Sequence, residues 1–226
     1  MKTLTQQLGF SRSTTHRLTS LLVQERYLRN NPNQGYLLGS KLLELGYQAH
    51  EAIPLVALAR PWLEKLAKFT GDTVHLATRD GDETLYLEKL PGTRGLEMRS
   101  RIGHRMPLLA TGIGKALLLD NNDAEWQRLY LYRRNKGAPV TAPDWALVQT
   151  RMRRYAISNY AFDLEDNEPS IRCVAAPVRD SGGRIVAAVS VSSMTAYMPQ
   201  KRMHALIKPV QDAAAAISAE LGKRQP

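Results

Sequence analysis

One stretch near the start of the chain decides its fold: Leu4-Thr-Gln-Gln-Leu8-Gly-Phe-Ser11-Arg-Ser-Thr-Thr-His-Arg-Leu18. Its first residues form a short helical pattern that Gly9 ends, because glycine adopts the left-handed conformation found at helix ends without a steric penalty. Ser11 then offers the N-cap of a second helix, which we expect to run to about Arg26. The stretch therefore predicts a helix, a tight turn and a second helix.

The second of these helices has one face to pack and one face left for contacts. Thr15, Leu18 and Leu22 fall on one side at spacings of three and four residues, so we expect that side to pack. The opposite side carries polar residues, which are Arg12, Ser13, His16, Arg17 and Ser20.

A β-hairpin is predicted directly after the helices. Residues 27–29 and 36–38 are largely apolar and flank the turn-rich segment Asn30-Asn-Pro-Asn-Gln-Gly35. A helix-turn-helix followed by a hairpin is a winged helix. Leucines within residues 41–51 then predict a connecting helix, and Pro54 marks a break after it. We expect a DNA-binding domain over residues 1–39, a linker helix over 40–53 and a larger domain over 54–226.

The larger domain is expected to be an antiparallel sheet covered by helices, which makes the chain an α+β protein of two domains. Apolar and β-branched runs predict strands at Thr73–Thr78, Thr84–Leu90, Leu96–Ser100, Ile157–Phe162, Ile171–Val178 and Ile185–Ser193. Asp180-Ser-Gly-Gly183 is the turn expected between the last two strands. Helices are expected at residues 55–69, 111–119, 123–132, 143–155 and 199–221.

Composition narrows the class of protein. The 226 residues are 43% hydrophobic, enough for two packed cores, and no apolar run marks a membrane span or a secretory signal. We therefore expect a cytoplasmic protein. Its one cysteine, Cys173, excludes an internal disulfide, and its histidines lack the spacing of a metal site. The net charge of +10 favours a polyanionic partner, although many basic proteins bind no nucleic acid.

Several motifs together resemble one known family. Leu8-Gly-Phe-Ser-Arg-Ser-Thr-Thr-His-Arg-Leu18 and Gly35-Tyr-Leu-Leu-Gly-Ser-Lys-Leu-Leu-Glu-Leu-Gly46 resemble regulators of the isocitrate-lyase-regulator (IclR) type. In the second domain the resemblance continues, in order, through residues 101–108, 111–116, 172–178 and 187–192. It implies a winged helix-turn-helix joined to a GAF-like α/β effector domain. It also implies a further helix before Leu4, so we expect this chain to lack its first helix and to leave Leu4, Leu8, Leu18 and Leu22 short of a packing partner.

The resemblance implies that the second helix enters the major groove of operator DNA. The residues expected to contact DNA are Ser11, Arg12, Ser13, Thr14, His16 and Arg17, with Arg29 in the wing. The alternative for the helix is an ordinary amphipathic surface helix, and a lone Arg29 is equally well explained as solvated. We interpret a second basic cluster as a solvated face rather than a DNA footprint: Arg128, Arg133, Arg134, Lys136, Arg151, Arg153 and Arg154.

A candidate ligand site lies in the second domain. Gly112 and Ile113 begin a helix whose backbone N–H groups can meet an anion. Ser190 and Ser192 project from one face of a strand, with Cys173 on its neighbour and Asp163 ten residues before that cysteine. In the resembled family the matching positions line the metabolite site, which implies the ligand set Gly112, Ile113, Asp163, Cys173, Ser190 and Ser192. Taken singly, these residues also suit a helix cap, a surface carboxylate, a core cysteine and strand filler.

An enzyme is the competing hypothesis. Cys173 or Ser190 could act as a nucleophile with His75 or His104 as the base, but no nucleophile elbow or other catalytic signature surrounds either. Gly112-Ile-Gly114-Lys115 lacks the full spacing of a phosphate-binding P-loop. We therefore expect no catalytic residues, no metal and no cofactor.

The function expected from these observations is transcriptional regulation. The partners are double-stranded operator DNA, a small carboxylate effector and further copies of the chain in a homodimer or homotetramer, without a membrane. Repression is the expected sign. A sugar acid is the first candidate effector, because the site offers several hydroxyl-binding groups, and 2-oxo acids and aromatic acids follow.

Overall fold

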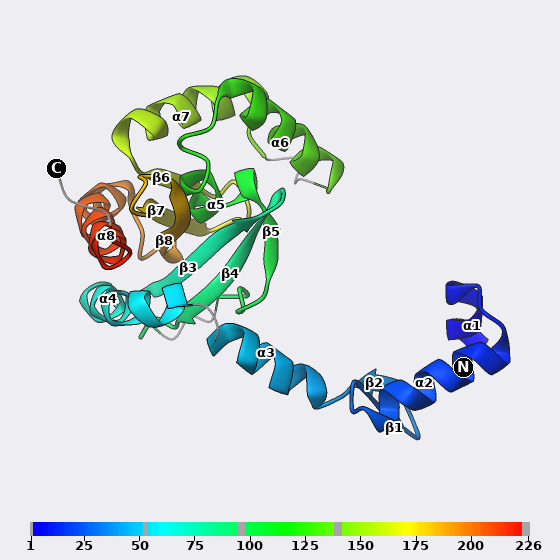
Figure 1. Cartoon of the computed structure of the whole chain (residues 1–226). Helices are drawn as coiled ribbons and strands as arrows, with labels where there is room; N and C mark the ends of the chain where they lie inside the picture. Colours follow the sequence, from blue (N-terminus) through cyan, green and yellow to red (C-terminus); the bar gives the residue numbers. More distant parts are fainter. Residues whose placement is uncertain (1, 52–53, 95–97, 138–141, 223–226) are drawn as a thin grey trace. The chain divides into compact units, whose positions relative to one another are not determined.

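The computed structural model describes residues 2–51, 54–94, 98–137 and 142–222 (Figure 1). The chain divides into two compact units, Met1–Pro54 and Leu55–Pro226. The first contains a two-stranded sheet and the second a six-stranded sheet. Among the described residues, every buried apolar side chain belongs to the second unit. The hydrophobic core of the protein is therefore the core of the larger unit.

The smaller unit has the order of a winged helix-turn-helix. Its elements are α1 (Lys2–Leu8), α2 (Arg12–Gln24), β1 (Leu28–Asn31), β2 (Gly35–Leu38) and α3 (Lys41–Glu51). Gly9 ends α1 in the left-handed region, with φ at 68°, as the sequence predicts. The Ser11 hydroxyl caps α2 by accepting the Thr14 N–H at 3.2 Å. The antiparallel pairing of β1 with β2 confirms the predicted hairpin.

The predicted packing face of α2 is correct at Thr15 and wrong at Leu18 and Leu22. Leu18 and Leu22 are 40% and 41% exposed, whereas Thr15 and Thr19 are buried at 0% and 5%. The packed side is centred on the two threonines, and both α1 and β1 contact this helix. Each threonine hydroxyl donates to the carbonyl oxygen four residues earlier, and this hydrogen bond offsets the desolvation of the buried hydroxyl. Leu8 is also exposed.

A close backbone approach explains the glycine between the hairpin and α3. A Cβ atom at Gly39 would lie 2.0 Å from the carbonyl oxygen of Arg26, so only glycine fits. The Gly39 N–H donates to the Tyr27 carbonyl at 2.8 Å. This contact ties the end of the hairpin to its beginning.

The larger unit is built on an antiparallel sheet with the strand order β5-β4-β3-β8-β7-β6. Its strands are β3 (Thr73–Asp80), β4 (Glu83–Leu90), β5 (Arg105–Pro107), β6 (Ala161–Leu164), β7 (Ile171–Arg179) and β8 (Ile185–Met194). The helices α4 (Pro54–Thr70) and α8 (Gln200–Glu220) lie side by side at the lower left of the sheet in Figure 1. In the predicted turn before β8, the Gly183 N–H donates to the Asp180 carbonyl, at 2.9 Å.

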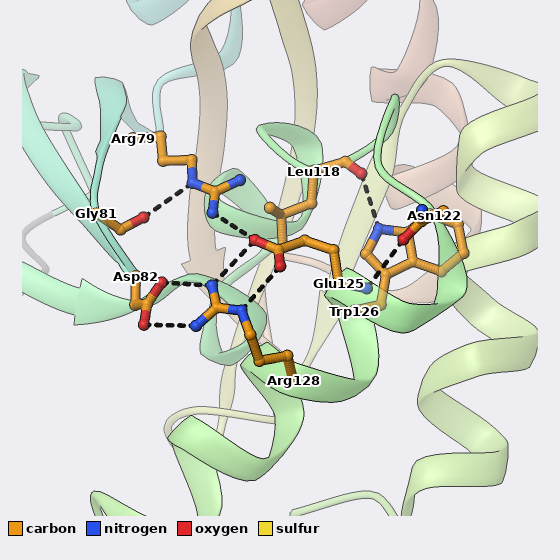
Figure 2. Close-up of polar contacts among 8 residues, drawn as sticks. All are labelled: Arg79, Gly81, Asp82, Leu118, Asn122, Glu125, Trp126 and Arg128. Carbon is orange, nitrogen blue, oxygen red and sulfur yellow. Dashed lines mark hydrogen bonds and ion pairs between the residues drawn. The ribbon is translucent and has the colours of Figure 1, made fainter.

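The other helices of this unit are a short 3-10 helix η1 (Leu108–Ala110), α5 (Gly112–Ala116), α6 (Asp123–Asn135) and α7 (Trp145–Ser158). Charged residues fix α6 to the turn between β3 and β4 (Figure 2). Arg128 of α6 donates to both carboxylate oxygens of Asp82, at 2.6 and 2.8 Å. Arg79 of β3 donates to Glu125 of α6 at 2.6 Å. On the other side of α6, the Trp126 indole N–H donates to the Leu118 carbonyl at 2.8 Å.

Two predicted strands differ from the structure. For the strand expected at residues 96–100, Leu96 and Glu97 lie outside the described residues and residues 98–100 form no strand. The carbonyls of Met98 and Ser100 instead accept hydrogen bonds from the Lys89 ammonium, at 2.7 Å each. The edge strand is β5, which pairs with β4. The strand expected from Ile157 begins only at Ala161, because α7 runs on to Ser158 and Asn159 ends it in the left-handed region.

The sequence predicts that the second basic cluster is a solvated face, but the structure shows this for only part of the cluster. Arg133 is 2% exposed and donates to the Leu109 carbonyl at 3.0 Å and to the Asp166 carbonyl. These backbone acceptors lie far from Arg133 in sequence, so nothing near it indicated its burial. Arg128 and Arg153 are exposed but form ion pairs with carboxylates. Within the part of the chain that the structure describes, no helix combines the length and apolar composition needed to cross a bilayer.

Candidate functional site

A cavity of about 430 Å³ lies in the larger unit, and the sequence analysis singled out six of the residues that line it. These six are Gly112, Ile113, Asp163, Cys173, Ser190 and Ser192. They come from α5 and from three adjacent strands, β6, β7 and β8. The fold thus brings together residues that are spread over 80 positions of sequence, as counted from Gly112 to Ser192.

Strand register explains why the polar members share a face. Asp163 pairs with Cys173 across β6 and β7, and Cys173 pairs with Ser192 across β7 and β8. Directly paired residues of antiparallel strands project to the same side of the sheet. Ser190 precedes Ser192 by two residues on β8 and therefore projects to the same side of the sheet. It pairs with His75 of β3. The result is a polar floor that crosses four strands.

Gly112 closes this floor from above. A Cβ atom at Gly112 would lie 2.9 Å from the backbone nitrogen of Asp163 and 2.9 Å from the Cys173 sulfur. The absence of a side chain therefore lets α5 sit directly on β6 and β7. Gly112 and Ile113 are the first residues of α5, where backbone N–H groups have no acceptor within the helix. Thr111 caps the helix by accepting the Gly114 N–H at 3.1 Å.

Asp163 is a buried carboxyl group with an altered protonation equilibrium. Burial raises its pKa to about 6, and the nearby Lys115 only partly opposes this rise. One of its oxygens accepts the Asp166 N–H at 2.8 Å, which fixes its orientation. Asp163 is therefore partly protonated near neutral pH, and it can either accept or donate a hydrogen bond to a ligand.

Cys173, a candidate nucleophile of the competing enzyme hypothesis, does not have the properties of a reactive thiol. Burial raises the pKa of the Cys173 thiol to about 12, so it stays protonated at neutral pH, and the thiolate is the reactive form. Burial, with the Lys89 charge, lowers the pKa of His75 to about 3, which keeps its imidazole neutral. His75 Nε2 lies 2.7 Å from the Ser100 hydroxyl. Among the described residues, Nδ1 of the same ring is buried without a hydrogen-bond partner.

Lys115 is engaged behind the cavity. It is 2% exposed, forms an ion pair with Asp166 and donates to the Phe162 carbonyl at 3.2 Å. Arg151 also donates to Asp166, at 3.0 Å. Burial alone would raise the pKa of Asp166, but the two cations hold it below its ordinary value. Lys115 is thus a counter-ion in the core and not a phosphate ligand. Among the described residues, no group of His, Cys, Asp and Glu could hold a metal ion.

The sequence analysis did not assign one part of the cavity wall to the ligand site, and it considered His75 and His104 only as bases of an enzyme. This wall contains aromatic, thioether and imidazole groups, which are His75, Tyr86, Met98, His104 and Met106. His75 and Tyr86 make an edge-on ring contact, with centroids 5.2 Å apart. Only the sheet order could have placed them at the cavity, because β3 pairs with β8, β4 with β3 and β5 with β4.

The residues expected to contact DNA lie on the smaller unit and are mostly exposed. Ser11, Arg12, Ser13, His16 and Arg17 are exposed along the first half of α2, and Thr14 is half-buried. Arg29 is exposed on β1. Within the described residues none of Arg12, Arg17 and Arg29 forms an ion pair, so their guanidinium groups are available to an anion. Ser11 and Thr14 are partly occupied, because their hydroxyls hydrogen-bond each other at 2.9 Å.

Two family models match the chain. The model described as "Bacterial transcriptional regulator IclR C-terminal" matches residues 47–219. The model described as "IclR helix-turn-helix domain" matches residues 1–32. The first alone spans more than half of the chain and includes every residue of the cavity.

Curated relatives and a solved structure are similar over nearly the whole chain. The HTH-type transcriptional regulator XynR of Escherichia coli is 36% identical over 95% of this chain and 86% of its own. The DNA-binding transcriptional repressor YiaJ of Escherichia coli is 31% identical over 97% of this chain and 79% of its own. The crystal structure of the Thermotoga maritima IclR superposes with a TM-score of 0.78 at 26% identity, covering 98% of this chain and 90% of that one.

Proposed function

The chain belongs to the IclR family of bacterial transcriptional regulators, and from that membership we propose that it is a repressor whose operator binding is controlled by a small carboxylate metabolite. Members of this family are DNA-binding regulators and not enzymes. The relative YiaJ is named a DNA-binding transcriptional repressor, which supports repression as the sign of the regulation.

The chemistry of the cavity is the observation that carries the effector proposal. The N–H groups of Gly112 and Ile113 supply donors for one carboxylate, and neutral donors suit a buried anion that must keep its hydrogen bonds. The hydroxyls of Ser190 and Ser192 and the carboxyl of Asp163 supply further polar partners on the floor. One anionic anchor with several hydroxyl partners favours a sugar acid over a 2-oxo acid or an aromatic acid.

The DNA-binding half of the proposal rests on α2 and the wing. Ser11, Arg12, Ser13, Thr14, His16 and Arg17 line the start of α2, and a helix of this kind reads base edges with its N-terminal residues. Arg29 in the wing would contact phosphate. One short helix reads few base pairs, so we propose that a homodimer or homotetramer places several such helices on a near-palindromic operator.

The effector would act by shifting a population. We propose a DNA-binding domain over residues 1–39, a linker over 40–53 and an effector domain over 54–226, with α3 transmitting the change. The effector then binds more tightly to the arrangement of the oligomer that does not fit the operator spacing. No new contact between effector and DNA is needed.

A thermal-shift screen tests the effector proposal. Sugar acids, 2-oxo acids and aromatic acids are compared with their neutral amides, because a ligand at about 100 times its Kd should stabilise the fold by roughly 2.7 kcal/mol. A rise in Tm restricted to carboxylates supports the proposal. The hits are then added to the protein bound to an operator selected from random DNA. Carboxylates that raise Tm without changing operator affinity would contradict control by the effector.

A further inference from the structure

A second cavity, of about 420 Å³, lies on the opposite face of the same sheet edge. Side-chain alternation along β6 separates the two cavities. Asp163 and Cys173 line the first cavity, whereas Phe162, Leu164 and Arg172 line the second. Successive residues of a strand point to opposite faces, and Leu164 pairs directly with Arg172. The two cavities are therefore distinct sites with β6 between them.

The second cavity is lined by three arginines and, among the described residues, by no carboxylate. Arg172 donates to Glu165 at 2.8 Å, and Arg151 donates to Asp166 at 3.0 Å, so each has a carboxylate partner. The third arginine, Arg154 of α7, has no carboxylate partner among the described residues. Since Arg151 gives only one of its five N–H donors to Asp166 in the contacts above, it keeps donors as well. Arg154 is therefore the arginine with which an anionic ligand can pair.

The wall beside these arginines is aromatic. The rings of Tyr160 and Phe162 have centroids 5.0 Å apart, and Phe162 meets His204 of α8 edge to face, at 5.5 Å and 85°. Tyr155 contacts Phe162 in the same way, at 6.1 Å and 74°. Rings arranged at steep angles present both faces and edges to a further flat ring. The cavity therefore combines a surface for a planar apolar group with a guanidinium for an anion.

We propose that this cavity, bounded by α7, α8 and β6, binds a small planar aromatic monocarboxylate. The carboxylate pairs with Arg154, because the planar guanidinium group of an arginine presents two parallel N–H donors to a carboxylate. The ring lies against Tyr160 and Phe162. Arg154 is the only arginine of this lining without a carboxylate partner among the described residues, so a single carboxylate is enough to pair with it.

Methionine methyl groups can report on the two cavities separately. Met203 lines the second cavity, and Met98 and Met106 line the first. The full-length protein, labelled with 13C at its methionine methyl groups, is titrated with benzoate and followed by NMR. Acetate, which lacks the ring, and benzyl alcohol, which lacks the charge, are titrated in parallel. The seven methionines of the chain are assigned by single leucine substitutions.

Benzoate is expected to shift the Met203 methyl signal saturably, with much weaker responses to acetate and benzyl alcohol. Arg154→Gln should raise the benzoate Kd read at Met203 by about tenfold, as the loss of a charge-assisted hydrogen bond predicts. Arg134→Gln is the matched control, because Arg134 is an exposed arginine of the same unit that lines neither cavity. Both side chains are exposed, so both variants should keep the wild-type Tm.

Three results would overturn the proposal. Shifts at Met98 and Met106 without one at Met203 would place the aromatic acid in the first cavity only. Equal benzoate affinity at Met203 in the wild-type protein and in Arg154→Gln would show that Arg154 does not bind the carboxylate. An equal response to benzyl alcohol would show that the cavity takes apolar rings and does not recognise a carboxylate.

Discussion

Asp163 on β6 and Cys173 on β7 are direct cross-strand partners, and the same two residues are the ones that a side chain at position 112 would strike. The floor of the cavity and its roof thus touch at one point. A change at any of the three positions is felt by the others. Four predictions concern this part of the larger unit, and a fifth concerns α2 of the smaller unit.

Gly112→Ala should destabilise the larger unit by about 1–3 kcal/mol, because its new methyl group would overlap backbone as well as sulfur. Urea unfolding measures the change. Gly182→Ala is the control, since Gly182 is exposed and its added methyl would meet only side-chain atoms, the Asp180 carboxylate at 3.3 Å and Arg184 Nε at 3.8 Å. Equal stability of the two variants would mean that α5 does not sit as closely on β6 and β7 as the structure has it.

Asp163→Asn should stabilise the protein above pH 6 and have little effect near pH 4. The pKa of Asp163 is raised to about 6 in the folded protein, so the folded state binds more protons than the unfolded state between about pH 4 and pH 6. Wild-type stability from this group therefore falls as pH rises through that window, and asparagine removes the loss. Unfolding of both proteins from pH 4 to pH 8 tests this. A difference that does not vary with pH would contradict the assigned protonation.

Ser190→Ala combined with Ser192→Ala should weaken binding of the carboxylate found in the thermal-shift screen by roughly 1–3 kcal/mol while the protein still folds. Calorimetric titration gives the affinity. Ser193→Ala is the control on the same strand, because Ser193 faces the other way and donates to Asp72 at 2.8 Å. An unchanged affinity in the double variant would place the effector elsewhere.

Asp166→Asn should destabilise the protein by about 3 kcal/mol, because it leaves the buried Lys115 without a counter-charge. Asp212→Asn, which removes an exposed ion pair with Lys208, should have little effect. Thermal and urea unfolding of both variants make the comparison. An equal loss of unfolding free energy in the two variants would mean that the Lys115 ammonium is stabilised by solvent or by another anion and does not depend on Asp166.

Arg12→Ala and Arg17→Ala should lower operator affinity and reduce its dependence on salt concentration, because each removes a cation available to phosphate or guanine. Fluorescence anisotropy with labelled operator at several salt concentrations measures both quantities. Arg134→Ala, in the larger unit, is the control for overall charge. Losses of the same size in all three variants would reduce the role of α2 to general electrostatic attraction.

Local signals account for the elements that could be predicted. Gly9, Ser11 and the Asp180–Gly183 turn act on residues within four positions of themselves, so the helix-turn-helix and the last hairpin could be identified from the sequence. The six cavity residues were found through the family resemblance, and their joint position was a prediction that the strand register then explained. The β-branched side chain of Ile157 favours a strand in the sequence, but α7 continues through this residue to Ser158.

The sequence by itself determined the turn between α1 and α2 and the turn of the last hairpin, because caps and glycines act on neighbouring residues. Only the tertiary structure decided that Thr19 is buried on α2 while Leu18 and Leu22 are exposed, that Arg133 lies in the core, and that β6 separates two cavities. These features depend on the order of strands in the sheet and on the elements packed against each face. Such pairings join residues far apart in the chain, and no short stretch of sequence carries the information.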